Sequence, residues 1–207
     1  QMFGWFNKEI NSLKDLQGLT MRIPSLGGEV FRRAGGVPVT MQVSEVFTAL
    51  QTGALDATEF VSPYNDLAAG YHTVAEYYYY PGWHEPGSTL ETIFNKEKFE
   101  SLPVDLQQIL MAGTEIMNQL LLDELMARNN EALRVLVEEH DVQLRKLPND
   151  VLTELHRISE EVVSEMALVD EQTARVFESW RNFRDNVINY NRIAEEAFIE
   201  ARNLPLD

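Results

Sequence analysis

The chain has 207 residues, of which 44% are hydrophobic, which is enough to fold into one sizeable domain or two lobes. No run of about 18 apolar residues occurs, so no membrane-spanning helix is expected. The absence of cysteine excludes disulfides, Cys-ligated zinc and thiol catalysis, and the net charge of −16 argues against nucleic acid and anionic membrane surfaces as partners, because both reward basic patches.

Short strands alternate with short helices from the start of the chain to Tyr80. The predicted elements are a helix at 12–17, a strand at 20–23, a helix at 26–34, a strand at 37–39, a helix at 43–52, a strand at 55–61, a helix at 63–70 and a strand at 74–80. This spacing favours an α/β fold with a mostly parallel sheet covered by helices. The four tyrosines at 77–80 should then point alternately to the two faces of a strand.

The pattern changes after Gly87. One further strand is predicted at 89–94, followed by a very long helix at 103–139, a strand at 142–147 and helices at 148–166 and 170–203. A helix of that length would span roughly 54 Å, so we expect it to bridge two lobes or to be kinked near 128–130. The strand at 142–147 has no obvious partner in this chain, and we expect it to pair with strands that lie upstream of Gln1.

Acidic residues occur without basic ones in one long stretch. No Lys or Arg lies between Arg33 and Lys96, although that stretch contains Glu45, Asp56, Glu59, Asp66, Glu76, Glu85 and Glu91. Carboxylates there have to be solvated, protonated or matched by something other than a nearby basic side chain. A bound cation is one candidate.

Three charged residues lie at the end of a predicted strand or just after one, where ligands bind in open α/β sheets. Arg22 could hold a carboxylate with two parallel hydrogen bonds, and a structural ion pair is the alternative. Glu59 and Glu85 could share a hard cation, which prefers oxygen ligands, and solvated surface glutamates are the alternative. His84 is adjacent to Glu85 but cannot form a metal site alone, and His72, His140 and His156 lack metal-ligand spacing. Neither a nucleophile elbow nor a phosphate loop occurs, so nothing in the sequence indicates catalysis.

Four segments carry a family resemblance: 1–6 (QMFGWF), 15–24 (DLQGLTMRIP), 47–57 (FTALQTGALDA) and 78–87 (YYYPGWHEPG). They resemble the solute-binding subunits of TRAP (tripartite ATP-independent periplasmic) transporters. The first and last resemble the branch that binds 2-oxo acids or lactate with a metal ion. The similarity extends over essentially the whole chain.

The resemblance implies a two-lobe periplasmic receptor that closes around a small organic acid and delivers it to a TRAP membrane permease. An intact member of the family has roughly another hundred or more residues before this point, which agrees with a chain that begins at Gln and shows no signal peptide. We therefore expect 1–87 to form the second, α/β lobe. Residues 88–147 are expected to supply a hinge strand, the spanning helix and a return strand to the first lobe, and 148–207 to supply helices that pack across the lobes.

The resemblance also implies a role for particular residues. Arg22 would hold the substrate carboxylate. Side-chain oxygens of Gln1, Glu59 and Glu85, together with the main-chain carbonyl of Phe60, would bind Na⁺ or Ca²⁺, which would in turn contact the substrate. Gln1, Phe60 and Glu85 are therefore expected at the substrate as well, and the substrate site is expected to include two further aromatic residues, Tyr64 and Trp83. Phe60 stands where many relatives have Trp.

Two other functions are considered. A metal-dependent hydrolase or lyase could use Glu59, His84 and Glu85, and it would need an open metal position and a general base. An acidic helical interaction module could use 104–207 as a partner surface. A homodimer through the last helix is a further possibility, and the identity of the acid and of the metal is left open by the sequence.

Overall fold

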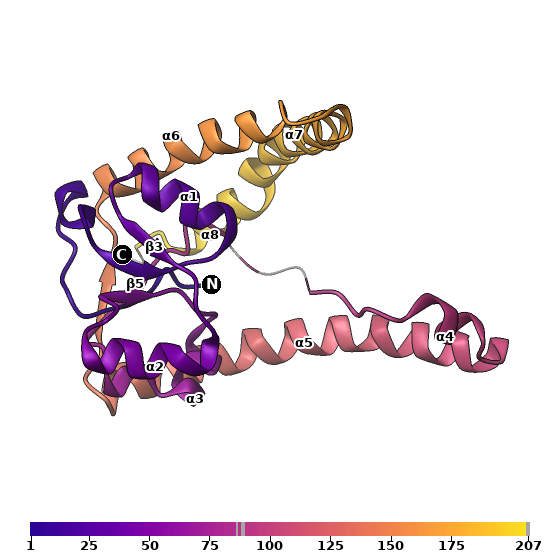
Figure 1. The fold of residues 1–207 in the computed structure, drawn as a ribbon, viewed down its shortest axis with the longest axis horizontal. Coiled ribbons are helices and arrows are strands. Elements are labelled where there is room, and N and C mark those ends of the chain that lie inside the picture. Colours follow the sequence, from indigo (N-terminus) through magenta and orange to yellow (C-terminus); the bar gives the residue numbers. More distant parts are fainter. Residues whose placement is uncertain (86, 88–89, 206–207) are drawn as a thin grey trace. The chain divides into compact units, whose positions relative to one another are not determined.

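The computed structural model describes residues 1–85, 87 and 90–205, and the chain divides into two compact units, Gln1–His156 and Arg157–Asp207 (Figure 1). The first unit contains the sheet, and the described part of the second unit is almost entirely helical. Helix α6 (Asn149–Met166) begins in the first unit and ends in the second.

Six strands form one mixed sheet in the described part of the first unit, in the order β3-β2-β4-β1-β5-β6. They are β1 (Gly4–Phe6), β2 (Thr20–Arg22), β3 (Val37–Val39), β4 (Ala57–Thr58), β5 (Tyr77–Tyr80) and β6 (Gln143–Lys146). Strand β2 runs parallel to β3 and β4, and β5 runs parallel to β6. Strand β1 lies between the two parallel groups and is antiparallel to both of its neighbours. The predicted α/β class is confirmed, but β1 makes the sheet mixed.

Helices cover both faces of this sheet (Figure 1). The helices of the first unit that precede α6 are α1 (Ser25–Arg33), α2 (Val43–Thr52), α3 (Pro63–Ala69), α4 (Lys96–Glu100) and α5 (Val104–Glu138), with 3₁₀ turns at Leu13–Leu16 and Tyr71–Thr73. Helix α2 buries Val46 and Leu50, which are four residues apart and therefore share a face. It ends at Gly53, whose φ of 75° is a left-handed conformation that favours glycine.

An aromatic pair lies at the centre of the core on the α2, α3 and α5 side. Trp5 of β1 and Tyr78 of β5 stack with ring centroids 4.1 Å apart, and neither is exposed to solvent. Around them are the buried side chains of Val46, Leu50, Leu55, Tyr71, Ala75, Leu136 and Val142. Tyr79 packs instead against Phe6, at 5.0 Å between ring centroids. The predicted alternation of the tyrosines is therefore confirmed for this pair of neighbours.

Three sequence predictions about strands differ from the structure, in a partner, in the existence of a strand or in its length. The strand at 142–147 was expected to lack a partner, but β6 pairs in parallel with β5, a pairing between segments more than sixty residues apart that no local pattern reports. No strand forms at 90–94, where Leu90 and Ile93 are exposed and pair with no described strand, and Thr89 of that prediction lies outside the described residues. The strand predicted at 55–61 pairs only at Ala57–Thr58. The Glu59 N–H makes the last ladder bond, to the Arg22 carbonyl, and residues 59–61 carry part of the candidate site.

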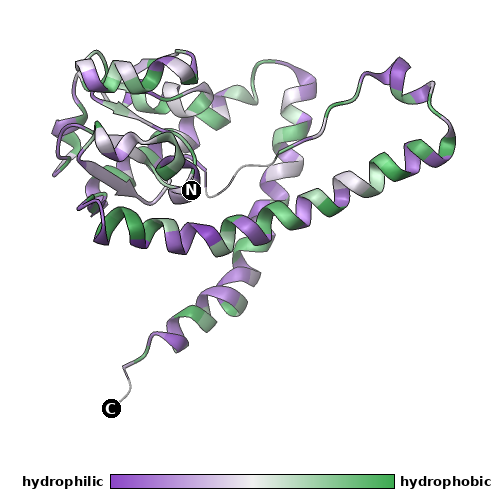
Figure 2. Cartoon of the chain, turned by 90° about the horizontal axis from the view of Figure 1, so that it is seen from below, coloured by the Kyte–Doolittle hydropathy of each residue, from purple (hydrophilic) through white to green (hydrophobic). Residues whose placement is uncertain are grey.

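Helix α5 continues for 35 residues without an interruption at 128–130, and of the two expectations for it the bridging of two lobes stays a prediction. Its last third packs against the rest of the first unit, where Ala132 and Leu136 are buried. The first two thirds project beyond the sheet and leave apolar side chains in solvent, visible as the hydrophobic bands in Figure 2. These exposed residues are Val104, Leu106, Ile109, Leu110, Met111, Ile116, Met117, Leu120, Leu121, Leu122 and Met126. In the described part of the chain, no helix combines the length and apolarity that crossing a bilayer requires.

The second unit contains the end of α6, followed by α7 (Glu171–Asn191), a π-helical turn (Arg192–Glu196) and α8 (Ala197–Arg202). The side chain of Asp170 caps α7 by accepting a hydrogen bond of 2.7 Å from the Thr173 N–H. The predicted helix at 170–203 is therefore present, with one wider turn inside it. Val176, Trp180 and Phe183 are exposed and lie on one face of α7, because they are spaced by four and three residues.

Candidate functional site

Four segments of the chain meet at one edge of the sheet. Strands β2 and β4 are parallel, so Arg22 at the end of β2 and Glu59 after β4 lie at the same edge. Strand β1 runs the opposite way, which brings the residues before it, including Gln1, to the edge where β4 and β5 end. The turn after β5 carries His84 and Glu85 to the same place. The antiparallel direction of β1 is thus what adds Gln1 to the group.

Two glycines permit the close approach of these segments. Gly4 has a φ of +143°, and a Cβ atom there would lie 2.1 Å from the carbonyl oxygen of Thr58. A Cβ atom on Gly82 would lie 2.9 Å from the carbonyl oxygen of Gln1. Both distances are too short for a side chain, so only glycine lets β1 pass directly beside the end of β4 and the turn after β5.

Glu59 is at the centre of the polar network. Its side chain is 5% exposed, and Oε2 lies 3.0 Å from Arg22 Nη1, which also donates to the Glu59 carbonyl at 3.2 Å. The Glu59 N–H donates to the Arg22 carbonyl at 2.9 Å, so these two residues are joined through main chain and side chain. On the other side, Gln1 Nε2 donates to Glu59 Oε1 at 3.2 Å and to the Phe60 carbonyl at 3.4 Å.

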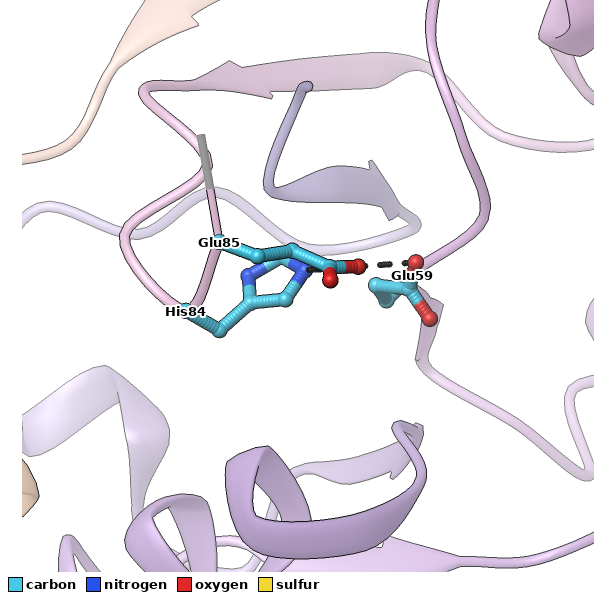
Figure 3. A group of neighbouring side chains, drawn as sticks. All are labelled: Glu59, His84 and Glu85. Carbon is cyan, nitrogen blue, oxygen red and sulfur yellow. Dashed lines mark ion pairs between the residues drawn. The ribbon is translucent and has the colours of Figure 1, made fainter. Parts of the chain in front are cut away.

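His84 and Glu85 complete a cluster with Glu59 (Figure 3). His84 Nε2 lies 3.9 Å from both Glu59 Oε1 and Glu85 Oε1, and one ligand atom from each residue falls within 4.8 Å of the others. The His84 side chain is only 9% exposed, and among the described residues neither ring nitrogen has a hydrogen-bond partner. The three side chains line a cavity of about 220 Å³ whose remaining wall is the first turn of α1, residues 24–27.

The residues present fit a hard cation. Na⁺ and Ca²⁺ take several oxygen ligands, and the edge offers the carboxylates of Glu59 and Glu85 and the carbonyl of Phe60. The Gln1 amide group already bridges two of these oxygens through its nitrogen, the electropositive end. A rotation of this amide by a half turn would present its oxygen instead, without moving the main chain.

Basic residues from outside the stretch 34–95 neutralise two of its seven acids. Arg22 pairs with Glu59, and Lys8 lies 2.6 Å from Asp56 Oδ1. The absence of nearby bases in the sequence therefore did not mean an absence of bases in space. Glu85, which is 42% exposed, lies beside only the His84 ring among the described ion pairs.

None of the three aromatic residues expected at the substrate lines this cavity, and their place at a substrate stays a prediction. The Phe60 ring packs edge-on against Tyr71 at 5.2 Å, so only its main-chain carbonyl faces the polar network. The Trp83 ring lies 5.9 Å from that of Phe3 and does not line the cavity. Tyr64 lies on α3, where Arg128 of α5 stacks over its ring at 5.4 Å, and it is not one of the cavity-lining residues.

One buried residue next to this network was not singled out from the sequence. Asp66 of α3 is 1% exposed and accepts hydrogen bonds from Trp5 Nε1 (3.0 Å), the Tyr78 hydroxyl (2.7 Å) and the Val61 N–H (3.2 Å). Burial raises the pKa of Asp66 to about 6, although the three donors oppose this shift. Its donors lie at widely separated positions in the chain, so no local pattern could have identified it.

A family model matches most of the chain. The model for bacterial extracellular solute-binding proteins of family 7, called DctP, matches residues 1–170. The monocarboxylate 2-oxoacid-binding periplasmic protein of Nostoc sp. (strain PCC 7120) is 38% identical over 198 residues, which cover 96% of this chain and 54% of that protein.

Solved structures of similar proteins agree with this match. A TRAP periplasmic solute-binding protein from Pseudoalteromonas atlantica, with bound sodium and pyruvate, is 36% identical with a TM-score of 0.90, covering 97% of this chain and 61% of that one. A TRAP transporter solute-binding protein from Bordetella bronchiseptica, a dimer with calcium and picolinate, is 32% identical with a TM-score of 0.92, covering 98% and 60%. The chain thus spans a little more than half the length of these proteins.

Proposed function

Because the chain belongs to the bacterial extracellular solute-binding proteins of family 7, the DctP family, we propose that it forms the ligand-binding lobe of a periplasmic TRAP-transporter receptor. The proposed ligand is a short 2-oxo or 2-hydroxy monocarboxylate, bound together with Na⁺ or Ca²⁺. The observation that carries the proposal is the meeting of Arg22, Gln1, Glu59, Glu85 and the Phe60 carbonyl at one sheet edge.

The ligand class follows from the chemistry of this edge. A cation held by Glu59, Glu85, the Phe60 carbonyl and the Gln1 amide would bind a carboxylate oxygen and a second donor on the adjacent carbon. Pyruvate and picolinate, the ligands of the two similar structures, both have such a donor, an oxo oxygen in one and a ring nitrogen in the other. The donor set therefore suits a chelating 2-substituted carboxylate better than a simple carboxylate.

Arg22 is proposed to bind the carboxylate end of this ligand. Among the described hydrogen bonds, those of its guanidinium use Nη1 and go to Glu59, which leaves Nη2 and Nε to a ligand. When a cation takes over the charge of Glu59, the guanidinium charge becomes matched by the ligand instead. In the absence of ligand and cation, the Arg22 guanidinium and the Glu59 carboxylate therefore neutralise each other.

The exposed part of α5 supports the proposed two-lobe organisation. A stripe of apolar side chains over two helical turns or more rarely stays in solvent, and the similar proteins are longer than this chain. We propose that residues 104–126 contribute to the first lobe, and the division into 1–87, 88–147 and 148–207 stays a prediction. The exposed stripe of Val176, Trp180 and Phe183 makes α7 the proposed surface for a homodimer.

The receptor is proposed to deliver its ligand to TRAP permease subunits without chemical turnover. Glu59, His84 and Glu85 do lie together, as a metal-dependent hydrolase or lyase would need, but the curated relatives matched are named as binding proteins. Incubation with 2-oxo and 2-hydroxy acids and Ca²⁺ should return them unchanged by NMR. Product formation that a chelator abolishes would favour the enzyme.

A thermal-shift screen of the full-length protein tests the proposed function. Pyruvate, lactate and longer 2-oxo acids are each added with and without Na⁺ or Ca²⁺. A ligand at 100 times its Kd stabilises the folded state by about 2.7 kcal/mol, which is an easily measured shift. Stabilisation by a short 2-oxo or 2-hydroxy acid that depends on the cation supports the receptor. No shift with any of these acids would refute the proposed ligand class.

A further inference from the structure

The peptide unit between Phe60 and Val61 links the proposed cation site to the buried core. The Phe60 carbonyl and the Val61 N–H belong to the same planar peptide, and in a trans peptide they point in opposite directions. The carbonyl faces the Gln1 amide at the sheet edge, and the N–H donates to Asp66 Oδ1 in the interior. Whatever fixes the N–H therefore also fixes the direction of the carbonyl.

Asp66 is itself held rigidly. Its Oδ2 accepts from Trp5 Nε1 at 3.0 Å and from the Tyr78 hydroxyl at 2.7 Å, and these two rings stack on each other with an angle of 16°. All three side chains are at most 1% exposed. A carboxylate with three donors in such an environment has one available position, because any other would leave buried donors unpaired.

The residues after β4 have little other support. The segment leaves the sheet ladder after the Glu59 N–H, and residues 60 and 61 belong to no strand or helix. The Val61 carbonyl accepts a longer hydrogen bond, 3.3 Å, from the Met2 N–H, and the Phe60 carbonyl accepts one of 3.4 Å from Gln1. Besides the packing of the Phe60 ring on Tyr71, the bond from Val61 to Asp66 is the one of this peptide's two described hydrogen bonds that reaches the buried core.

We propose that Asp66 is a positioning residue for the cation site: by holding the Val61 N–H, it keeps the Phe60 carbonyl turned toward the ion. Asp66 does not touch the ion or the ligand. This inference rests on the proposed function, since it concerns a carbonyl that is proposed to bind the cation. It adds a residue from outside the group that meets at the sheet edge, and it explains why a carboxylate lies buried in this core.

The Asp66→Asn variant breaks the arrangement in a defined way. Asparagine has one oxygen for three donors, so either Trp5 or Val61 must face its NH₂ group. Trp5 is fixed by its stacking with Tyr78, whereas the 60–61 peptide belongs to no strand or helix that would fix it. The asparagine oxygen should therefore turn toward Trp5 and Tyr78, and the peptide should turn away. Cation affinity should fall by about tenfold or more, the equivalent of one lost ion contact.

Two further variants separate positioning from stability. Tyr78→Phe removes one hydrogen bond to Asp66 but keeps the acceptor for Val61, so stability should fall while Ca²⁺ affinity changes by less than about threefold. Adding Trp5→Phe to Asp66→Asn removes the competing donor, which lets the asparagine oxygen accept from Val61 and its NH₂ group donate to the Tyr78 oxygen. This second substitution weakens the core further, yet it should restore most of the Ca²⁺ affinity.

The experiment is a Ca²⁺ titration of the full-length protein and these variants in the presence of pyruvate, by calorimetry, with urea unfolding in parallel. Wild-type affinity in Asp66→Asn, or no recovery in the double variant, would overturn the positioning role alone. No Ca²⁺ binding by the wild type would overturn the proposed function as well. If Asp66→Asn does not fold, hydrogen exchange of the wild type decides: the Val61 amide should be protected without the ion, and exchange at the rate of an exposed amide would refute the inference.

Discussion

Replacement of Arg22 by alanine tests whether one guanidinium serves both Glu59 and the ligand. Arg22 Nη1 lies 3.0 Å from Glu59 Oε2, and the two side chains are 17% and 5% exposed. In such a shielded site the loss of one charged partner costs about 2–5 kcal/mol, against about 0–1 kcal/mol for a surface pair. At about 1.4 kcal/mol per tenfold, Arg22→Ala should raise the Kd for pyruvate by about 30-fold to several thousandfold.

Calorimetry with pyruvate in saturating Ca²⁺ measures this change, with Arg32→Ala as the matched control. Arg32 is 60% exposed and pairs with Glu29 at 2.8 Å on the surface of α1, so its loss should change the Kd by less than about threefold. Ca²⁺ should also recover part of the stability that Arg22→Ala loses, because the ion replaces the partner of Glu59. An Arg22→Ala protein that binds pyruvate within threefold of the wild type would refute the role given to this guanidinium.

Three further predictions concern the cation, the buried acid and the close approach of β1. Glu85→Gln should weaken Ca²⁺ binding by about tenfold or more but change the free energy of unfolding by less than about 0.5 kcal/mol, because this side chain is 42% exposed. A loss of stability in urea that matches the loss of Ca²⁺ affinity would instead make Glu85 a structural residue. Burial raises the pKa of Asp66 from 3.8 to about 6, so the stability that its protonated form contributes is complete below about pH 3.8 and falls by about 3 kcal/mol as the pH rises through about 6. The difference in unfolding free energy between wild type and Asp66→Asn should follow that change, and a constant difference between pH 4 and 7 would contradict it. Gly4→Ala should destabilise the protein by more than about 2 kcal/mol in urea, because its Cβ would lie 2.1 Å from the Thr58 carbonyl oxygen. Gly18 has a φ of +74° but the Cβ of Gly18→Ala would meet no atom within 4 Å, so this variant should cost less, about 1 kcal/mol; equal effects would refute the argument from close approach.

Local sequence patterns were sufficient for most helices and for the strands that end at the site. Capping residues, glycines and apolar spacing predicted α1, α2, α3 and α5 within a few residues of their observed bounds. The same local patterns did not predict which distant strands pair. The partner of β6 is β5, and the role of 4–6 as a central antiparallel strand depends on two glycines and on neighbours more than fifty residues away. Such pairings are set by the whole fold and not by the segment itself.

The predicted strand at 89–94 shows that a strand-like composition alone does not make a strand. Its composition, with Leu90, Ile93 and Phe94, suits a strand, but β-propensity reflects packing against neighbours more than an intrinsic backbone preference. In this structure residues 90–94 belong to no strand, and their apolar side chains are exposed.

The site was predictable to the extent that it depends on strand ends. Arg22, Glu59 and Glu85 lie at or after the ends of strands, and the edge of an α/β sheet is where ligands bind, so their positions could be argued from the sequence. Gln1 could not, since only the antiparallel direction of β1 brings it there, and the family resemblance supplied it. Asp66 was one of seven acids without a nearby base, and only the packing of Trp5 against Tyr78 separates it from the others.

The most direct test of the account is the coupling between cation and ligand in the full-length protein. The Kd for pyruvate is measured by calorimetry in chelator-treated, sodium-free buffer and then with Ca²⁺ or Na⁺, and the Kd for Ca²⁺ is measured with and without pyruvate. The account predicts that the cation tightens pyruvate binding and that pyruvate tightens Ca²⁺ binding by the same factor, because coupling between two ligands is reciprocal. Pyruvate binding with the same affinity in the absence of any cation would contradict the shared site at the edge of the sheet.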